Sequence, residues 1–298
     1  MIDVVDPKST SLKKGHVRFE EANAKNPGFK RQCTWHSDLR HVAKANSDLV
    51  IVSTDASIRS QVILSLAKTG KHQLFLLEKP VCQSEDEYNR ILEIFHAKSC
   101  RGWVNTIRRY NPFYQRYACS GNVGGINMQV TGKLFGLGSN AIHFLDLFQM
   151  IAGGEGVKIT KTKLLRSTSS SKRGSNFLEI EGSIYGTDNI GNRFMLSSLE
   201  SETKTIKVKI SKKDLSINVD EVNCTIVLKD NDGYRRETFQ ELLVSKSTTS
   251  ISTDLLETGN CLLPPLASSY GIHRQLFLHF RNYLYEVTGL CYEKIPIT

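Results

Sequence analysis

The sequence lacks the features that mark membrane-spanning, disulfide-rich and zinc-binding proteins. Its longest apolar runs, such as DLVIVS and HQLFLLE, are far shorter than the ~18 residues that cross a bilayer. Its N-terminus has no basic and then apolar signal pattern. The seven cysteines are odd in number and scattered without a C-x-x-C pair, so neither a disulfide framework nor a zinc site is indicated. We therefore expect a cytoplasmic protein with no bound metal and no membrane partner.

The sequence also lacks a zinc finger, an RNP-like motif and a basic stripe interleaved with aromatic residues. Lys and Arg total 39 against 30 Asp and Glu, which gives a net charge of +9 and favours an anionic partner such as a nucleotide or phosphosugar. Much of the excess lies in residues 158–173 and 204–213. There Lys207 and Lys209 alternate with apolar residues, as on a solvated sheet face. We do not expect a nucleic-acid partner.

The first hundred residues alternate short apolar runs with helical patterns. Runs that are almost wholly apolar are typical of parallel strands covered on both faces. Short strands separated by helices indicate βαβ units. Strands are expected over 2–7, 48–54 and 72–80, and helices over 8–24 (at least in part), 37–46, 59–70 and 84–99.

From about Trp103 the pattern changes to strands and hairpins, separated by turn signals such as Gly191-Asn192. Runs of strands after an alternating region predict a second, α+β domain on a largely antiparallel sheet. We place the two domains at 1–104 and 105–298. Residues 167–175 are interpreted as a flexible loop. Strands are expected over 124–133, 156–167, 176–186, 192–200, 205–211, 215–220 and 224–230, and helices over 140–154 and 273–287.

Polar residues stand where the apolar strands of the first domain end. Asp6 and Thr54 end two of them, and Glu78-Lys79 ends the third. Ligands of parallel sheets bind beyond the carboxyl ends of the strands, so these side chains are expected at a ligand site. A surface salt pair is the alternative for Glu78 and Lys79, but it does not explain why both charges end an apolar strand.

The ordered set VVDP, DLVIVST, GKHQLFLLEKP, GWVNTIRRYNP and GSNAIHFLDLFQMIAG resembles the Gfo/Idh/MocA oxidoreductase family over most of the chain. Its most specific pieces are Glu78-Lys79-Pro80 and His143-x-x-Asp146. The resemblance implies a Rossmann domain for a nicotinamide dinucleotide and then a substrate domain on an open sheet. It implies hydride transfer at a hydroxyl carbon of a sugar, cyclitol or nucleotide sugar, in carbohydrate or surface-polysaccharide metabolism. It also implies a homo-oligomer, formed through the open sheet face.

The sequence departs from the family at its front. Family members begin with a strand and a glycine-rich turn that receives the pyrophosphate, whereas G-x-G-x-x-G occurs nowhere here. We therefore expect an incomplete Rossmann sheet, and favour a truncated chain over a functional short form. A non-catalytic sensor or partner-binding protein on the same scaffold is the alternative function.

The resemblance assigns cofactor roles to the strand ends. Asp6 would accept hydrogen bonds from the adenosine ribose and so favour NAD, although the neighbouring Lys8 leaves NADP as an alternative. Asp6 can also be interpreted as an ordinary turn aspartate. The segment that begins at Thr54 can also be interpreted as a loop that caps the following helix. The expected cofactor-binding residues are Asp6, Thr54, Glu78, Lys79 and Asn105.

The resemblance also assigns the chemistry. His143 would remove the hydroxyl proton, since imidazole has an unperturbed pKa of ~6.5. Asp146, on the same helix face, would orient His143 or contact the substrate. Lys79 would stabilise the alkoxide. Alone, a histidine among apolar neighbours is more often structural.

Further residues are expected near the junction of the two domains. Arg108 and Arg109 would hold an anionic substrate or clamp the interface through ion pairs. Asn140 is a substrate-binding candidate, next to Ser139, which stands where the family commonly has an aspartate. His273, in the late helix, is a weaker candidate.

Overall fold

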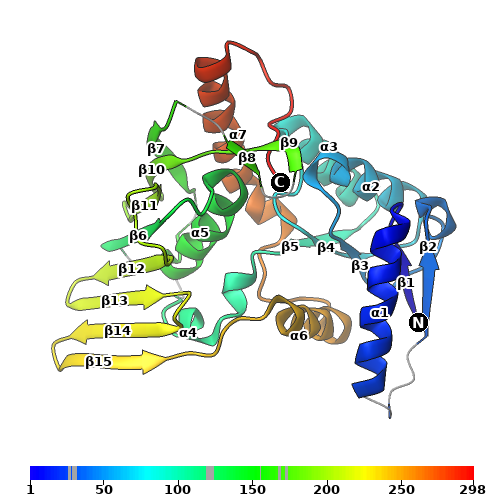
Figure 1. The fold of residues 1–298 in the computed structure, drawn as a ribbon, viewed down its shortest axis with the longest axis horizontal. Coiled ribbons are helices and arrows are strands. Elements are labelled where there is room, and N and C mark those ends of the chain that lie inside the picture. The colour runs from blue at the N-terminus through cyan, green and yellow to red at the C-terminus, as the bar shows by residue number, and fades with distance from the viewer. Residues whose placement is uncertain (26–27, 29–31, 119–123, 155, 167–168, 172–173) are drawn as a thin grey trace.

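The computed structural model describes residues 1–25, 28, 32–118, 124–154, 156–166, 169–171 and 174–298. Two small parallel sheets come from the N-terminal third of the chain, and a large mixed sheet comes from the rest (Figure 1). The predicted fold class, an incomplete Rossmann-type parallel sheet followed by an α+β region on a largely antiparallel sheet, is confirmed.

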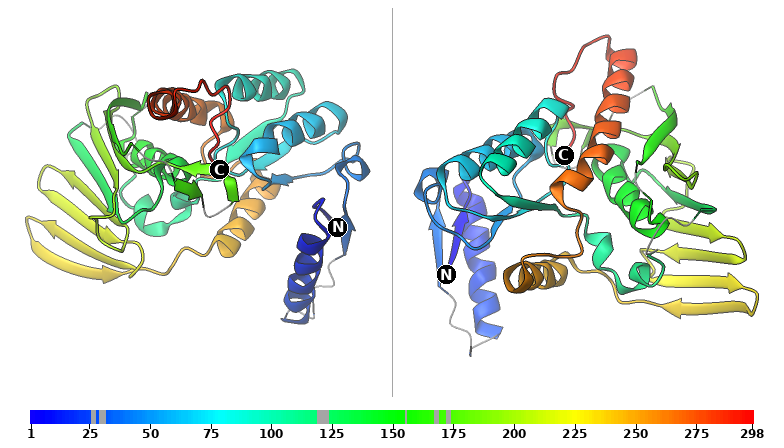
Figure 2. Two further views of the ribbon diagram at one scale, coloured as in Figure 1. Left: turned by 45° about the horizontal axis from the view of Figure 1, so that its top comes forward. Right: turned by 180° about the vertical axis from the view of Figure 1, so that it is seen from behind.

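The first parallel sheet holds only two strands. β1 (Ile2–Val5) and β2 (Cys33–His36) pair in parallel, and α1 (Ser9–Lys25) lies between them in sequence. The ring of Trp35 anchors α1 to this pair, because Phe19 of the helix meets it edge-on at 6.0 Å. In Figure 2 this unit lies at one end of the molecule.

The second parallel sheet has the order β3-β4-β5. Its strands are β3 (Val50–Val52), β4 (Leu74–Leu77) and β5 (Arg101–Val104), and the crossover helices are α2 (Ala56–Thr69) and α3 (Glu85–Ala97). All four residues of β4 are buried, as expected for a parallel strand covered on both faces. The predicted helices over 59–70 and 84–99 are confirmed.

Local sequence explains where α3 begins. The hydroxyl of Ser84 accepts a hydrogen bond from the Glu87 N–H at 3.3 Å, which caps the helix. Three acidic residues in the first turn also suit the positive end of the helix dipole. Tyr88, Ile91 and Phe95 then form the buried face.

The helix predicted over 37–46 is wrong. The structure has only a single 3₁₀ turn, η1 (Leu39–His41), capped by Asp38, whose carboxylate accepts from the Arg40 N–H at 2.8 Å. The segment offers apolar side chains for one turn only, so burial does not stabilise a second turn. A single helical turn is costly to nucleate and is not propagated.

The large sheet has the order β15-β14-β13-β12-β6-β11-β10-β7. Its neighbours are antiparallel except β6 and β11, which are parallel. The predicted alternation on β12 is confirmed, since Val208 and Ile210 are buried while Lys207 and Lys209 are exposed. The strands are β6 (Ile126–Gly132), β7 (Lys158–Leu164), β10 (Gly182–Thr187), β11 (Arg193–Ser198), β12 (Lys207–Lys212), β13 (Leu215–Asp220), β14 (Thr225–Asp230) and β15 (Gly233–Thr238).

Two long helices lie against the large sheet. α5 (Leu137–Ala152) is buried over most of its length and ends at Gly153, which adopts the left-handed conformation at φ 65°. α7 (Leu266–Thr288) contacts α5, β7, α3 and β5, so it touches both halves of the chain. Between β5 and β6 lie η2 (Ile107–Tyr110) and the short helix α4 (Pro112–Gln115).

Several elements lie outside the predicted ranges: β2, β5, α4, β8 (Ser169–Ser171), β15 and α6 (Val244–Thr258). β9 (Gly174–Glu179) overlaps the strand predicted over 176–186. β8 and β9 form an antiparallel hairpin, so the loop interpretation is wrong for the described part of 167–175. Residues 167–168 and 172–173 lie outside the described residues. A serine-rich segment carries no apolar alternation, and only tertiary pairing makes it a strand.

The core runs through both halves. A single cluster joins Val52 and Phe75 of the parallel sheet with Phe144 and Phe148 of α5. α6 also returns to the first half, where its apolar face packs on β4 and β5. The domain boundary at residue 104 stays a prediction. Among the described helices, none combines the length and the apolar character needed to cross a membrane.

Candidate active site

The turn after β4 brings a lysine to the junction of the two halves. The Lys79–Pro80 peptide bond is cis. The Lys79 side chain is only 5% exposed, and its Nζ donates a hydrogen bond to the carbonyl oxygen of Ser139, at 2.6 Å, in the first turn of α5. A lysine at the carboxyl end of a parallel strand therefore reaches the helix that carries His143.

Arg59 connects this turn to the loop after β3. Its side chain is fully buried, and its guanidinium donates to the carbonyl oxygens of Pro80 and Thr54. The loops after β3 and β4 are thus joined by one side chain.

His273 also contacts this turn, through a hydrogen bond to its backbone. Its Nε2 accepts from the Val81 N–H at 3.2 Å, and its Nδ1 lies 2.9 Å from the carbonyl oxygen of Ser269. These partners assign the proton to Nδ1. Burial lowers the pKa of His273 to about 4, so the ring is neutral near pH 7. We therefore assign His273 a supporting role at the turn.

Two buried polar atoms at the ends of β3 and β5 lack hydrogen-bond partners among the described residues. Asn105 donates through Nδ2 to Glu78 Oε1 at 2.5 Å. Among the residues that the structure describes, neither Asn105 Oδ1 nor Thr54 Oγ1 has a hydrogen-bond partner, and both atoms are buried. An unsatisfied buried polar atom costs about 1–3 kcal/mol, so a polar ligand at this edge would be stabilised by satisfying them.

Asp6 lies at the end of β1, on the other parallel sheet. Its Oδ1 accepts from the Lys8 N–H at 2.8 Å, which forms a local turn. The glycines that precede Gly102 are Gly15, Gly28 and Gly70, and none of them follows a strand. The part of the chain that the structure describes therefore has no glycine-rich turn at the strand ends.

Both carboxylate oxygens of Asp146 accept hydrogen bonds. Its carboxylate is 1% exposed and accepts from Thr106 Oγ1 at 2.6 Å and from Arg109 Nε and Nη2 at 2.8 and 2.7 Å. This arrangement orders Arg109 and η2 against α5. The role predicted for Asp146 toward His143 or the substrate stays a prediction, as does that of His143, which is buried one turn earlier.

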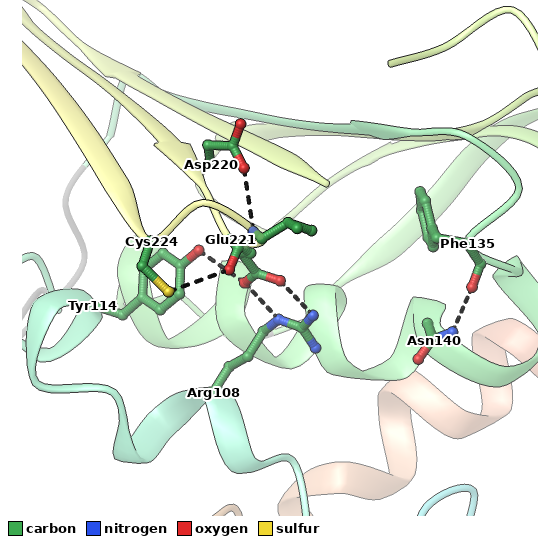
Figure 3. Close-up of polar contacts among 8 residues, drawn as sticks. Arg108, Tyr114, Phe135, Asn140, Asp220, Glu221 and Cys224 are labelled. Atoms are coloured by element: carbon green, nitrogen blue, oxygen red, sulfur yellow. Dashed lines mark hydrogen bonds and ion pairs between the residues drawn. The ribbon is translucent and has the colours of Figure 1, made fainter. Parts of the chain in front are cut away.

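Arg108 is also held by a carboxylate. Its Nε and Nη2 donate to Glu221 at 2.8 and 2.6 Å, and the hydroxyl of Tyr114 donates to the same carboxylate at 3.0 Å (Figure 3). The guanidinium carbon lies 4.0 Å from the centre of the Phe144 ring. Both arginines thus pair with carboxylates of residues 105–298, and the two predicted roles, holding a substrate and clamping the interface, stay predictions. An anionic substrate would have to displace these carboxylates to bind the arginines.

A cavity of about 750 Å³ opens beside Lys79 and is lined by residues of both halves. Ser139 and Asn140 line it from α5, and Asn140 Nδ2 donates to the Phe135 carbonyl oxygen at 2.5 Å (Figure 3). Lys133 lines another part. The structure thus brings Lys79 and Asn140 to one cavity, whereas Asp6 lies on the separate sheet.

Two carboxylates that the sequence analysis missed also line this cavity. Glu179 accepts from the hydroxyl of Ser139 at 2.6 Å and from its N–H at 3.2 Å. Glu181 accepts from Ser198. Burial raises the pKa of Glu181 to about 7, and the charge of Glu179 adds to the rise. Their spacing in NFLEIEG, two residues apart and so on one strand face, was the signal available.

Comparison with known proteins gives structural relatives only. No protein-family model matches the chain, and no curated protein matches it in sequence. Among solved structures, an oxidoreductase from Agrobacterium radiobacter in complex with NAD+, L-tartaric acid and magnesium superposes with a TM-score of 0.68 at 15% identity, covering 92% of this chain and 86% of that one.

Two further structures cover nearly all of the chain. A Gfo/Idh/MocA family oxidoreductase from Vibrio cholerae has a TM-score of 0.67 at 13% identity, covering 95% of this chain and 90% of that one. The UDP-N-acetylglucosamine 3-dehydrogenase GnnA from Acidithiobacillus ferrooxidans has a TM-score of 0.63 at 16% identity, covering 96% and 98%. The chain therefore has the fold of the Gfo/Idh/MocA oxidoreductases.

Proposed function

We propose that the protein is an NAD-dependent oxidoreductase, with NADP as the alternative cofactor, that acts at a hydroxyl carbon of a sugar, cyclitol or nucleotide sugar. The observation that carries the proposal is the buried Lys79, which ends a parallel strand and borders a cavity shared by both halves. Structures with this fold include an NAD+ complex and a nucleotide-sugar dehydrogenase. Cytoplasmic location and homo-oligomer formation stay predictions.

The strand ends fit one half of the cofactor. Thr54 Oγ1 and Asn105 Oδ1 are buried and have no hydrogen-bond partner among the described residues. With Glu78 they suit the amide and ribose hydroxyls of the nicotinamide half. Asp6 suits the adenosine ribose. The pyrophosphate is not matched among the described residues, because no glycine-rich turn stands at a strand end.

The side chains of the junction supply charge and proton transfer. When bound, the nicotinamide accepts or gives the hydride. Lys79 stabilises the negative charge that develops on the substrate oxygen, and burial makes this interaction stronger than in water. His143 takes the hydroxyl proton in the oxidation direction and returns it in the reduction direction. Arg59 and His273 hold the lysine turn, and Asp146 holds Arg109 beside α5.

The cavity favours a ligand rich in hydroxyl groups. Carboxylates such as Glu179 accept hydrogen bonds from hydroxyls, and Asn140 both donates and accepts. Lys133 provides a positive group for a phosphate or carboxylate on the substrate. A hydroxylated ring with an anionic substituent suits this mixture, as in sugar phosphates and nucleotide sugars.

An activity screen tests the proposal. The purified chain is mixed with NAD+ or NADP+ and a panel of polyols, sugars, nucleotide sugars and hydroxy acids, and reduced nicotinamide is followed by absorbance. With an active substrate, we expect Lys79→Met and His143→Leu each to lower kcat about a hundredfold. Lys98→Met, an exposed lysine on the far end of α3, should leave kcat unchanged.

A sensor or partner-binding protein is the second candidate. The observation in its favour is that no glycine-rich turn follows a parallel strand in the described part of the chain, because weak dinucleotide binding disfavours turnover. A folded chain that binds sugars or nucleotide sugars, and turns over none of them with either cofactor, would overturn the enzymatic proposal and support this one.

A further inference from the structure

The large sheet has one face against helices and one open face. α5 contacts β6 and β11, and α7 contacts β7. Figures 1 and 2 show no described helix over the opposite face. Successive side chains of a strand point to opposite faces, and the apolar ones, such as Val208 and Ile210, are buried. The residues between them, such as Lys207 and Lys209, therefore lie on the open face.

The strand register places the side chains of the open face in rows. The middle row runs from Lys161 on β7, opposite Tyr185, to Lys209 on β12 and Arg236 on β15. Neighbouring strands are ~4.8 Å apart, so this row spans roughly 34 Å. The basic groups of the middle row are therefore spread across the whole sheet and are not gathered at one edge.

The rows on either side of the middle row carry the same charge. One flanking row contains Lys158, Arg193 and Lys229, and the other contains Lys163 and Lys207. All of these residues are exposed, as are the basic residues of the middle row. We call this set of lysines and arginines the basic rows. Every other residue that the strands place on the open face is uncharged, except one aspartate.

Two carboxylates adjoin the basic rows, and neither pairs with them. Asp220 stands opposite Lys207, but its carboxylate accepts from the N–H and Nδ2 of Asn223, both at 3.0 Å, and so closes a turn. Glu202, in the connection between β11 and β12, accepts from the hydroxyl of Ser197 at 3.0 Å. Within the described part of the chain, no carboxylate forms an ion pair with a residue of the basic rows. The open face is therefore strongly positive.

We propose that the open face, through its basic rows, docks the acidic surface of a separate protein. Carboxylates of the partner pair with the lysine and arginine side chains. Uncharged groups between them, such as the Gln129 amide and the Ser211 hydroxyl, offer hydrogen bonds. Opposite charge across the interface speeds association, and added salt weakens it. The proposal does not rest on hydride transfer at the junction of the two halves.

A second copy of the chain fits this face less well. Two copies packed through it would bring basic rows against basic rows, and the aspartate of this face, Asp220, is already bound within its own turn. Like charges across an interface cost free energy and select against that partner. The homo-oligomer expected through the open sheet face is therefore an alternative outcome of the test.

Nucleic acid is another polyanion, and the face suits it less well than an acidic protein. Single strands bind where aromatic rings stack on successive bases. On this face Tyr185 is half-buried, and Tyr234 lies on the edge strand β15 with the Lys229 ammonium 5.3 Å from its ring centre. Most of the basic rows are lysines, which lack the planar fork with which arginine binds phosphate. The described strands thus present scattered positive charges and no stacking platform.

A synthetic peptide tests the proposal. The probe is a fluorescent peptide of about sixteen residues in which glutamate alternates with threonine, so its carboxylates share one face when it is extended. We expect saturable binding at ~50 mM salt, measured by fluorescence anisotropy, and an affinity at least about tenfold weaker at ~200 mM salt. The same peptide with glutamine in place of glutamate should not bind.

Two double variants with the same change in net charge separate the basic rows from general attraction. Lys207→Glu combined with Lys209→Glu should weaken peptide binding about tenfold or more. Lys13→Glu combined with Lys14→Glu, at exposed sites of α1, should weaken it by less than about twofold. Carbodiimide coupling of the bound peptide should join its glutamates to lysines of the basic rows, as identified by mass spectrometry of the digested chain.

The proposal fails if the folded chain shows no saturable binding at low salt, if both double variants weaken binding equally, or if coupling occurs mainly at Lys13 and Lys14. Tighter binding of single-stranded oligothymidylate with the same number of negative charges would assign the face to nucleic acid instead. A dimer that excludes the peptide, and that dissociates when Lys207 and Lys209 are replaced, would assign it to a second copy.

The test does not depend on one variant being folded. If the β12 double variant fails to fold, Lys161→Glu combined with Lys163→Glu on β7 makes the same comparison at the other side of the face. The salt series, the glutamine peptide and the coupling pattern use the unaltered chain, and they decide between docking on the basic rows and general attraction.

Discussion

Arg59 is a buried guanidinium that joins two loops of the candidate site. It donates to the carbonyl oxygens of Thr54 and Pro80, and its loss would leave buried acceptors unsatisfied. We predict that Arg59→Met lowers the free energy of unfolding by roughly 2–4 kcal/mol, measured by urea denaturation. Arg90→Met, an exposed arginine on α3, should change it by less than about 0.5 kcal/mol. Equal effects would contradict the bridging role.

His273 makes stability depend on pH in a defined direction. Its pKa is about 4 in the folded chain and ~6.5 when unfolded, so the unfolded state binds the proton first as pH falls. The free energy of unfolding is therefore highest above pH ~6.5 and falls as the pH drops from ~6.5 to ~4. Between pH ~6.5 and ~4, we predict that the free energy of unfolding falls by roughly 3 kcal/mol less in His273→Phe than in the unaltered chain. Replacing the exposed His16 by Gln should leave the dependence intact, and a matching loss would refute the assignment.

Glu181 acts in the opposite direction. Its carboxyl has a pKa of about 7 when folded and 4.5 as the ordinary value, so the folded state disfavours its charge. The cost is absent below pH ~4.5 and complete above pH ~7. We predict that Glu181→Gln raises the melting temperature at pH 8. The free energy of unfolding rises by at most roughly 3 kcal/mol at that pH, and this gain disappears near pH 4.5. The exposed Glu257→Gln should give no such pH-dependent gain.

Single residues differ in how well sequence reveals them. Lys79 was found because a charge directly after an apolar strand has few structural explanations. Glu179 and Glu181 were missed because the segment around them resembles an ordinary strand, whereas Glu179 ends β9 and Glu181 lies between β9 and β10. Only the packing of α5 places Ser139 against Glu179. For Arg108 the sequence left the clamp and the substrate-binding role open. The ion pair of Arg108 needs Glu221, which lies more than a hundred residues later in the sequence. No local pattern indicates this partner.

At the scale of elements, α6 ties the end of the large sheet back to the first half. Its buried Leu255 packs with Leu76 and Trp103 of the parallel sheet, whereas the adjacent Leu256 is 54% exposed. We predict that Leu255→Ala lowers the free energy of unfolding by about 2–5 kcal/mol. Leu256→Ala should change it by less than about 0.5 kcal/mol. Similar losses in chemical denaturation would show that α6 is not docked as described.

Elements with strong periodicity were predicted, and those without it were not. The strands over 48–54 and 72–80 and the helices over 59–70 and 84–99 have consistent apolar patterns and appear in the structure. α6 was missed because its sequence, VSKSTTSISTDLLET, is rich in serine and threonine, which disfavour helix interiors. Burial against the parallel sheet overrides that propensity.

For the molecule as a whole, the junction of the two halves was beyond the sequence pattern. The resemblance implied an incomplete parallel sheet, but only the strand order shows that the parallel strands form two separate sheets. The candidate site is assembled from the ends of β3, β4 and β5, from α5 and from the β9–β10 segment. These segments lie far apart in sequence, and the continuous core that joins them is a tertiary feature.

Titration of the chain with NADH, followed by nicotinamide fluorescence and thermal unfolding, tests whether a nicotinamide dinucleotide binds at the ends of the parallel strands. We predict saturable binding and a rise in melting temperature, and about tenfold weaker binding by Asn105→Leu, which removes a buried acceptor at the strand ends. Asn89→Leu on α3 is the matched control and should bind as the unaltered chain does. A folded chain that binds neither NADH nor NADPH, or binds equally well after Asn105→Leu, would contradict a nicotinamide site at this sheet edge.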